Sequence, residues 1–148
     1  MKRLAFIAPL LLAALAACGE EPQLRVSDGW VRLSPLPDRP SAAYFTIHGG
    51  PTPAELISVH TGVAIRTEIH DMAMNGKVMQ MRPITGNIPV PALGTVDFAP
   101  GGKHIMLFNV NPGIKPGSAM PFIFTFADGT RIQYNARAQA AGDPPPEK

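Results

Sequence analysis

Apolar and polar positions alternate in short runs along this chain, and Gly or Pro interrupts the runs every eight to twelve residues. No stretch keeps the helical period of about 3.6 residues over three turns, whereas short alternating runs between turn residues are typical of β-strands. The pattern predicts nine strands. They are expected at residues 26–33, 42–47, 55–59, 64–70, 78–84, 95–98, 104–110, 122–126 and 131–136. Strands of this length and number predict an all-β fold, a Greek-key β-sandwich.

The N-terminal segment has the features of an export signal. Lys2 and Arg3 precede an apolar run over residues 4–17, which is shorter than the roughly 20 residues that span a bilayer. The run ends in "LAACG", which resembles a bacterial lipobox, where the cysteine, here Cys18, receives the lipid. We therefore expect cleavage after residue 17 and a lipoprotein anchored to a membrane in the bacterial periplasm or cell envelope. The alternative is an ordinary cleaved signal peptide with an incidental cysteine.

The rest of the chain is expected to form one domain. Residues 18–25 are predicted to be a tether, residues 26–139 the β domain, and residues 140–148, with three consecutive prolines, a disordered tail. Cleavage removes two of the 13 basic residues and none of the 11 acidic ones, so the mature domain is close to neutral. Such a charge balance argues against nucleic acid as a partner.

Four residues carry the donor atoms of a candidate metal site: His70, Met81, His104 and Met106. Met106 follows His104 at i+2, which on a strand places the imidazole and the thioether on one face. Ten residues lie between His70 and Met81, enough for one strand to end and the next to return alongside. Thioether sulfur suits Cu(I) and is a poor ligand for Zn²⁺, Mg²⁺ or Ca²⁺. If the four side chains converge, the site should prefer copper, as Cu(I).

Strand parity relates part of this set to the core. Ile105 belongs to the apolar face of its strand, so His104 and Met106 should point the other way. His70 falls on the polar face of its own strand, near the surface. Taken alone, a histidine on such a face is more often solvated than metal-bound.

Further methionines, Met72, Met74 and Met79, lie between His70 and Met81. Methionine is a common filler of irregular core gaps, and this interpretation also applies to Met81 taken alone. It is favoured for Met79, whereas Met72 and Met74 are open between a flexible loop and a role at the site.

Nothing in the sequence predicts catalysis. There is no Ser-His-Asp arrangement, no paired-carboxylate pattern and no Gly-rich phosphate loop. A blue-copper electron-transfer site needs a cysteine ligand, and with Cys18 lipidated the domain has none. We therefore expect a protein that binds and transfers a metal, not an enzyme.

Several segments resemble one known family, the periplasmic copper chaperones called PCuAC. They are "EIHDMAMNGKVMQMR" from Glu68, "VDFAPGGKHIMLFNV" from Val96 and "FIFTFADGT" from Phe122, together with "WVRLSP" and "AAYFTI" near the start of the domain. The family pattern is a His, a Met about ten residues later, and a His-x-Met beyond some twenty more. It falls here on His70, Met81, His104 and Met106, with 22 residues in the second interval, one more than in the family. Position 71 is Asp71, where the family often has Met, so an auxiliary ligand would be Met72.

The resemblance implies a cupredoxin-like fold and the delivery of Cu(I) to a cuproprotein. The implied client is the copper centre of cytochrome c oxidase, in subunit II, with a thiol-oxidoreductase assembly factor as a further partner. Two alternatives stay open from the residues themselves. One is a protein that sequesters and buffers copper in the envelope, and the other is a structural β-sandwich with incidental Met and His.

Overall fold

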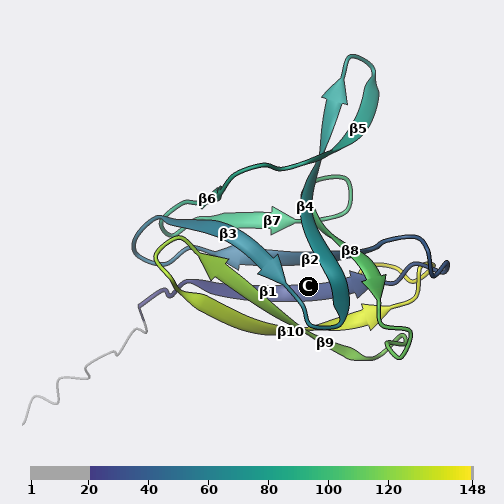
Figure 1. Cartoon of the computed structure of the whole chain (residues 1–148). Helices are drawn as coiled ribbons and strands as arrows, with labels where there is room; N and C mark the ends of the chain where they lie inside the picture. The colour runs from purple at the N-terminus through teal and green to yellow at the C-terminus, as the bar shows by residue number, and fades with distance from the viewer. Residues whose placement is uncertain (1–20, 148) are drawn as a thin grey trace, which may run out of the picture.

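The computed structural model describes residues 21–147, and this part of the chain forms ten β-strands and no helix (Figure 1). The strands are β1 Arg25–Arg32, β2 Ser41–His48, β3 Ala54–His60, β4 Ala64–Asn75, β5 Val78–Pro83, β6 Ile88–Val90, β7 Thr95–Phe98, β8 His104–Val110, β9 Ala119–Phe126 and β10 Arg131–Gln139. The all-β prediction is confirmed, and all nine expected strands are present. Over residues 21–147, no helix has the length and apolarity needed to cross a membrane. The predicted signal segment and Cys18 lie outside the described residues.

The strands join edge to edge in the order β5-β4-β8-β2-β1-β10-β9-β3-β6, and β7 pairs with β2. All neighbours run antiparallel except β1 and β10, which run parallel. The ring of Phe45 on β2 meets Phe122 and Phe124 of β9 edge to face, with centroids 5.0 and 4.9 Å apart. Because β1 and β10 separate β2 from β9 in the sheet order, these rings face one another across the core of the sandwich.

Alternation along the strands separates core side chains from those on the outer face. In β9, Phe122, Phe124 and Phe126 are fully buried, as expected for a core stripe. In β8, Ile105 and Leu107 have no exposed surface and belong to the core cluster. The intervening residues of β8 therefore lie on the opposite face of the sheet.

Strand β4 changes its partner half-way along its length. Its first half pairs with β8 from Ala64 to His70, and its second half pairs with β5 from His70 to Asn75. The paired parts of β4 and β5 form a hairpin that projects from the sandwich (Figure 1). Gly76 has φ +64°, which suits the first central residue of a two-residue type II′ turn between Asn75 and Val78. His70 thus marks the point where β4, β5 and β8 meet.

Candidate metal centre

The register of three neighbouring strands brings the predicted ligands to one face of the sheet. His70 lies directly opposite His104 in the β4–β8 pair. Met72 lies directly opposite Met81 in the β4–β5 pair. Residues opposite one another on antiparallel strands share a face, as do residues at i and i+2, so Met106 joins the same group. The strand pairing therefore brings these residues, which are distant in sequence, to one face of the sheet.

A hollow of about 290 Å³, open to solvent, lies on this face. Three of the four predicted ligands, Met81, His104 and Met106, line it together with Met72. His70 is adjacent, with its ring centroid 5.9 Å from that of His104. The residues that line the hollow are Pro40, Ala42, Tyr44, Met72, Met81, Gly101, His104 and Met106.

The His104 side chain is held with one nitrogen free. The side chain is buried, with 4% exposure, and its Nδ1 is 2.8 Å from the carbonyl oxygen of Gly102. A carbonyl oxygen can only accept, so Nδ1 carries the proton and Nε2 keeps its lone pair. Nε2 is buried and has no hydrogen-bond partner among the residues that the structure describes. An unpaired buried nitrogen is costly, whereas a backbone carbonyl on one ring nitrogen is the usual arrangement of a histidine that binds metal through the other.

His70 is oriented in a comparable way by a carboxylate. Its Nε2 lies 2.9 Å from Oε2 of Glu68, and its Nδ1 is buried without a partner in the described part of the chain. The hydrogen bond from His70, and then the nearby Arg66 guanidinium, hold the pKa of the Glu68 carboxyl below its usual value. The ionised carboxylate accepts the Nε2 proton, which leaves the lone pair on Nδ1. Both histidines therefore keep one unpaired ring nitrogen, and they lie on the face of the sheet that carries the methionines.

One aromatic side chain of β2 borders the hollow. Tyr44 lines it and packs against Trp30, with ring centroids 4.5 Å apart. Burial raises the pKa of Tyr44, although the Arg32 guanidinium opposes the shift. Arg32 lies over both rings, 4.9 Å from the centroid of Trp30 and 5.9 Å from that of Tyr44. Tyr44 is therefore a neutral, mainly apolar wall and not a competing anionic ligand.

The exposure of the methionines corrects part of the sequence interpretation. The expectation that Met79 fills the core is wrong, since 48% of it is exposed. Met81 is 49% exposed and Met74 60%, so core packing accounts for neither. The physical reason is that the hairpin of β4 and β5 projects beyond the sandwich, and its methionines lie where no second sheet layer covers them. Met72 is on this hairpin and not in a loop.

Glu68 was not foreseen as part of the site. The signal that could have found it is its position two residues before His70, which places both side chains on one face of a strand. A carboxylate next to a metal-binding histidine is a common partner for the ring nitrogen that does not bind.

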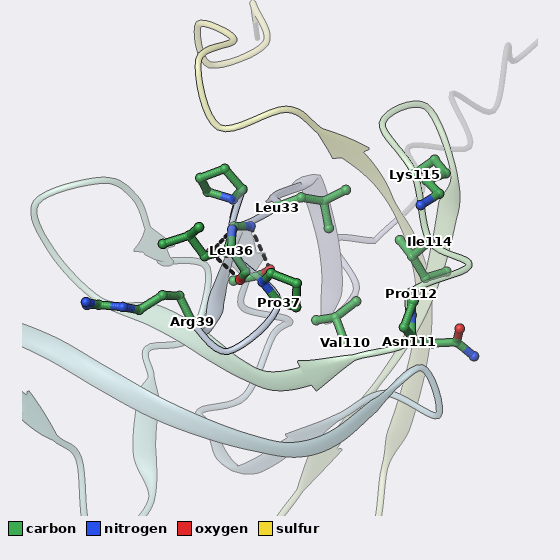
Figure 2. A pocket seen from close by; sticks show the side chains of 12 residues that line it. Leu33, Leu36, Pro37, Arg39, Val110, Asn111, Pro112, Ile114 and Lys115 are labelled. Carbon is green, nitrogen blue, oxygen red and sulfur yellow. Dashed lines mark hydrogen bonds between the residues drawn. The ribbon is translucent and has the colours of Figure 1, made fainter.

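Another hollow, of about 200 Å³, lies beside the loop between β1 and β2 and the segment after β8 (Figure 2). Its twelve lining residues are mostly aliphatic side chains and prolines, with Arg39 and Lys115 as the charged ones. They include neither His nor Met. The described residues also contain no group of three or more His, Cys, Asp or Glu that could hold a metal ion. Histidine and thioether donors therefore come together at the first hollow.

Residues 24–138 match the model of the family described as "Putative lipoprotein LpqE-like". The chain belongs to this family. It is 31% identical over 115 residues to the uncharacterized protein RP573 of Rickettsia prowazekii, a match that covers 73% of this chain and 59% of the relative. It is 24% identical over 108 residues to "Putative lipoprotein Lxx21020" of Leifsonia xyli subsp. xyli, covering 72% of this chain and 64% of that protein. The chain thus spans about three-fifths of the length of these relatives.

Solved structures show the same fold. The copper-bound PCuAC domain from PmoF2 superimposes with a TM-score of 0.62 at 19% identity, over 81% of this chain and 97% of that domain. The apo PCuAC domain from PmoF1 gives 0.65 at 21% identity, over 82% and 97%. The solution structure of Cu(I)-bound DR1885 from Deinococcus radiodurans gives 0.57 at 25% identity, over 86% and 85%. The predicted cupredoxin-like β-sandwich and the resemblance to PCuAC domains are confirmed.

Proposed function

We propose that this protein binds one Cu(I) ion through His70, Met81, His104 and Met106 and passes it to another exported protein. Met72 serves as a further thioether ligand, because it lies directly opposite Met81 and lines the same hollow. Two imidazoles and neutral thioethers form a soft donor set that suits Cu(I) better than Zn²⁺. Copper is the cargo here, and no step of its transfer requires a change of oxidation state.

One observation carries the proposal: Nε2 of His104 is buried without a partner among the described residues, and His104 lines a hollow together with three methionines. Buried polar atoms are nearly always paired, so an unpaired one that faces soft donors is the expected state of a ligand without its ion. Solved domains of the same fold hold copper, one of them as Cu(I), which supports copper as the ion.

An anaerobic Cu(I) titration of the purified protein, with a chromophoric chelator as competitor and mass spectrometry for stoichiometry, tests the binding. One ion per chain should bind tightly, and Zn²⁺ at equal concentration should not displace it. The variant His104→Ala should lose most of the affinity, whereas His60→Ala, a histidine on β3 outside the hollow, should keep it. The assignment of His104 as a Cu(I) ligand would be wrong if the two variants bound Cu(I) equally well. The four-ligand site as a whole would be wrong if Zn²⁺ displaced Cu(I).

The half-exposed Met81 supports transfer more than permanent storage, since an acceptor can reach a sulfur at the rim without unfolding of the site. We place the protein in the bacterial periplasm, anchored through Cys18 after cleavage of residues 1–17. The client we propose is the copper centre of cytochrome c oxidase subunit II, with a thiol-oxidoreductase assembly factor as the second partner. Deletion of the protein should then lower oxidase activity at low copper, with recovery when copper is added. A buffering protein would instead leave oxidase activity intact and lower resistance to excess copper.

A further inference from the structure

The projecting hairpin of β4 and β5 carries two methionine pairs, one behind the other. The inner methionine pair, Met72 and Met81, lies at the hollow. The outer methionine pair, Met74 and Met79, comes two residues further toward the turn, and its members are again directly opposite one another. Because positions i and i+2 share a face, all four thioethers lie on the side of the hairpin that leads to His104.

The other face of the hairpin is mainly polar. Asn75 donates a hydrogen bond to Gln80 at 3.1 Å, and Arg82 donates one to the same oxygen at 3.3 Å. Asp71 forms an ion pair with Lys103 at 3.7 Å. Along the two strands, the residues that alternate with the methionines are Asp71, Ala73, Asn75, Val78, Gln80 and Arg82. The hairpin therefore has one face that carries the methionines and one that is mainly polar. Its outer methionine pair is exposed and does not pack on the sandwich.

Packing does not account for the outer methionine pair. Met74 is 60% exposed and Met79 is 48% exposed. Side chains opposite one another on antiparallel strands have Cβ atoms about 4.5–5.5 Å apart, and methionine is long and flexible, so two sulfurs can reach one ion. The inner pair is about 7 Å further along the strands. Two thioethers without an imidazole bind Cu(I) through the same soft chemistry with fewer donors.

We infer that Met74 and Met79 form a second, weaker Cu(I) site, through which the ion enters and leaves the inner site. This inference rests on the proposed function and adds the path of the ion to it. Cu(I) moves from the outer methionine pair to the inner pair by ligand exchange: one copper–sulfur bond breaks as another forms, and copper stays monovalent. The last donors reached are the imidazoles of His104 and His70.

The variant that tests this is Met74→Leu with Met79→Leu in the full chain. Leucine keeps the hairpin surface apolar and removes only the sulfur. A loss of copper binding or a change in the rate of copper removal therefore reports on the sulfur ligands and not on the apolar surface of the hairpin. Both positions are exposed, and the swap nearly conserves volume, so the fold should be unaffected. Met120→Leu is the matched control, because Met120 is a fully buried methionine on β9.

Two measurements decide the matter, both made anaerobically with Cu(I) and the chelator bicinchoninate. In NMR spectra of the methionine ε-methyl groups, a first equivalent of Cu(I) should shift the inner pair, and a second equivalent should shift Met74 and Met79. The double variant should lose the second equivalent and keep its affinity for the first within about twofold, which is under 0.5 kcal/mol. Removal of the first ion by the chelator should become several-fold slower, whereas Met120→Leu should behave like the parent.

The outcomes separate the two proposals. If the parent binds no Cu(I) tightly, the proposed function fails, whatever the hairpin does. If the first equivalent binds and the double variant loses copper to the chelator at the parental rate, the proposed path of the ion through the outer methionine pair (the relay) is overturned. The relay is equally overturned if the second equivalent leaves the methyl signals of Met74 and Met79 unshifted.

Discussion

The carboxylate of Glu68 should control how well His70 binds copper, although it donates nothing to the ion itself. Its Oε2 accepts the Nε2 proton of His70 at 2.9 Å and so fixes the lone pair on Nδ1. In Glu68→Ala that acceptor is lost, and the ring is free to rotate and to exchange tautomers before it binds. Loss of such an outer partner typically lowers metal affinity 10–100-fold. Because the Glu68 side chain is 34% exposed, water can replace it in part, and we expect Cu(I) affinity to fall about tenfold.

A second substitution separates the hydrogen bond from the charge. Glu68→Gln keeps an oxygen that can accept the same proton, and its loss of affinity should be clearly smaller than that of the alanine variant. Asp71→Ala is the matched control, because it removes one carboxylate next to His70 whose partner is Lys103 and not the imidazole. Competition titration with a Cu(I) chelator measures all three variants. The argument is refuted if Glu68→Ala binds as tightly as the parent, or if Asp71→Ala loses as much.

Three further predictions concern ligation, a structural reporter and acid stability. Met81→Leu and Met106→Leu should each weaken Cu(I) binding. The free energy of unfolding of the metal-free protein, measured in urea, should change by less than about 1.5 kcal/mol, as is usual for this substitution. Unchanged copper affinity would show that both methionines are packing residues and not ligands. Trp30, the one tryptophan of the chain, packs on Tyr44 at the hollow, so its fluorescence should change until one equivalent of Cu(I) is bound and then level off; a constant signal during tight binding would place the ion elsewhere. The Thr130 backbone N–H donates to Asp128 at 2.8 Å and, with the Thr130 hydroxyl, holds the pKa of that carboxyl below its usual 3.8. This contribution is present above pH 3.8 and is lost as the pH falls through the lowered pKa. Asp128→Asn should therefore be less stable than the parent at neutral pH, with a difference that shrinks in acid; a constant difference in pH-dependent urea unfolding would contradict this.

Local alternation was sufficient to predict which face of a strand the ligands occupy. Ile105 is in the core, and His104 and Met106 point away from it, as the two-residue period requires. The bounds of β7 and β8 match the predicted ones, since Gly and Pro residues limit the segments on either side. Short strands whose residues favour different structures were harder to predict. Strand β6 was missed because Ile88–Val90 has three residues and a central proline, which is ordinarily evidence against a strand.

The sequence by itself determined the chemistry of the candidate donors, the absence of a thiol from residues 19–148, the β class and the orientation of His70, His104 and Met106 on their own strands. The tertiary structure decided the register that sets His70 opposite His104, because pairing between strands depends on contacts that no local window contains. It also decided that β4 continues past His70 into a projecting hairpin. Residues 71–75 and 78–82 alternate in the same way whether or not a second layer covers them, so only the packed molecule shows that Met79 on β5 faces solvent. Sequence periodicity fixes the direction of a side chain, and the neighbouring strands decide what that side chain meets.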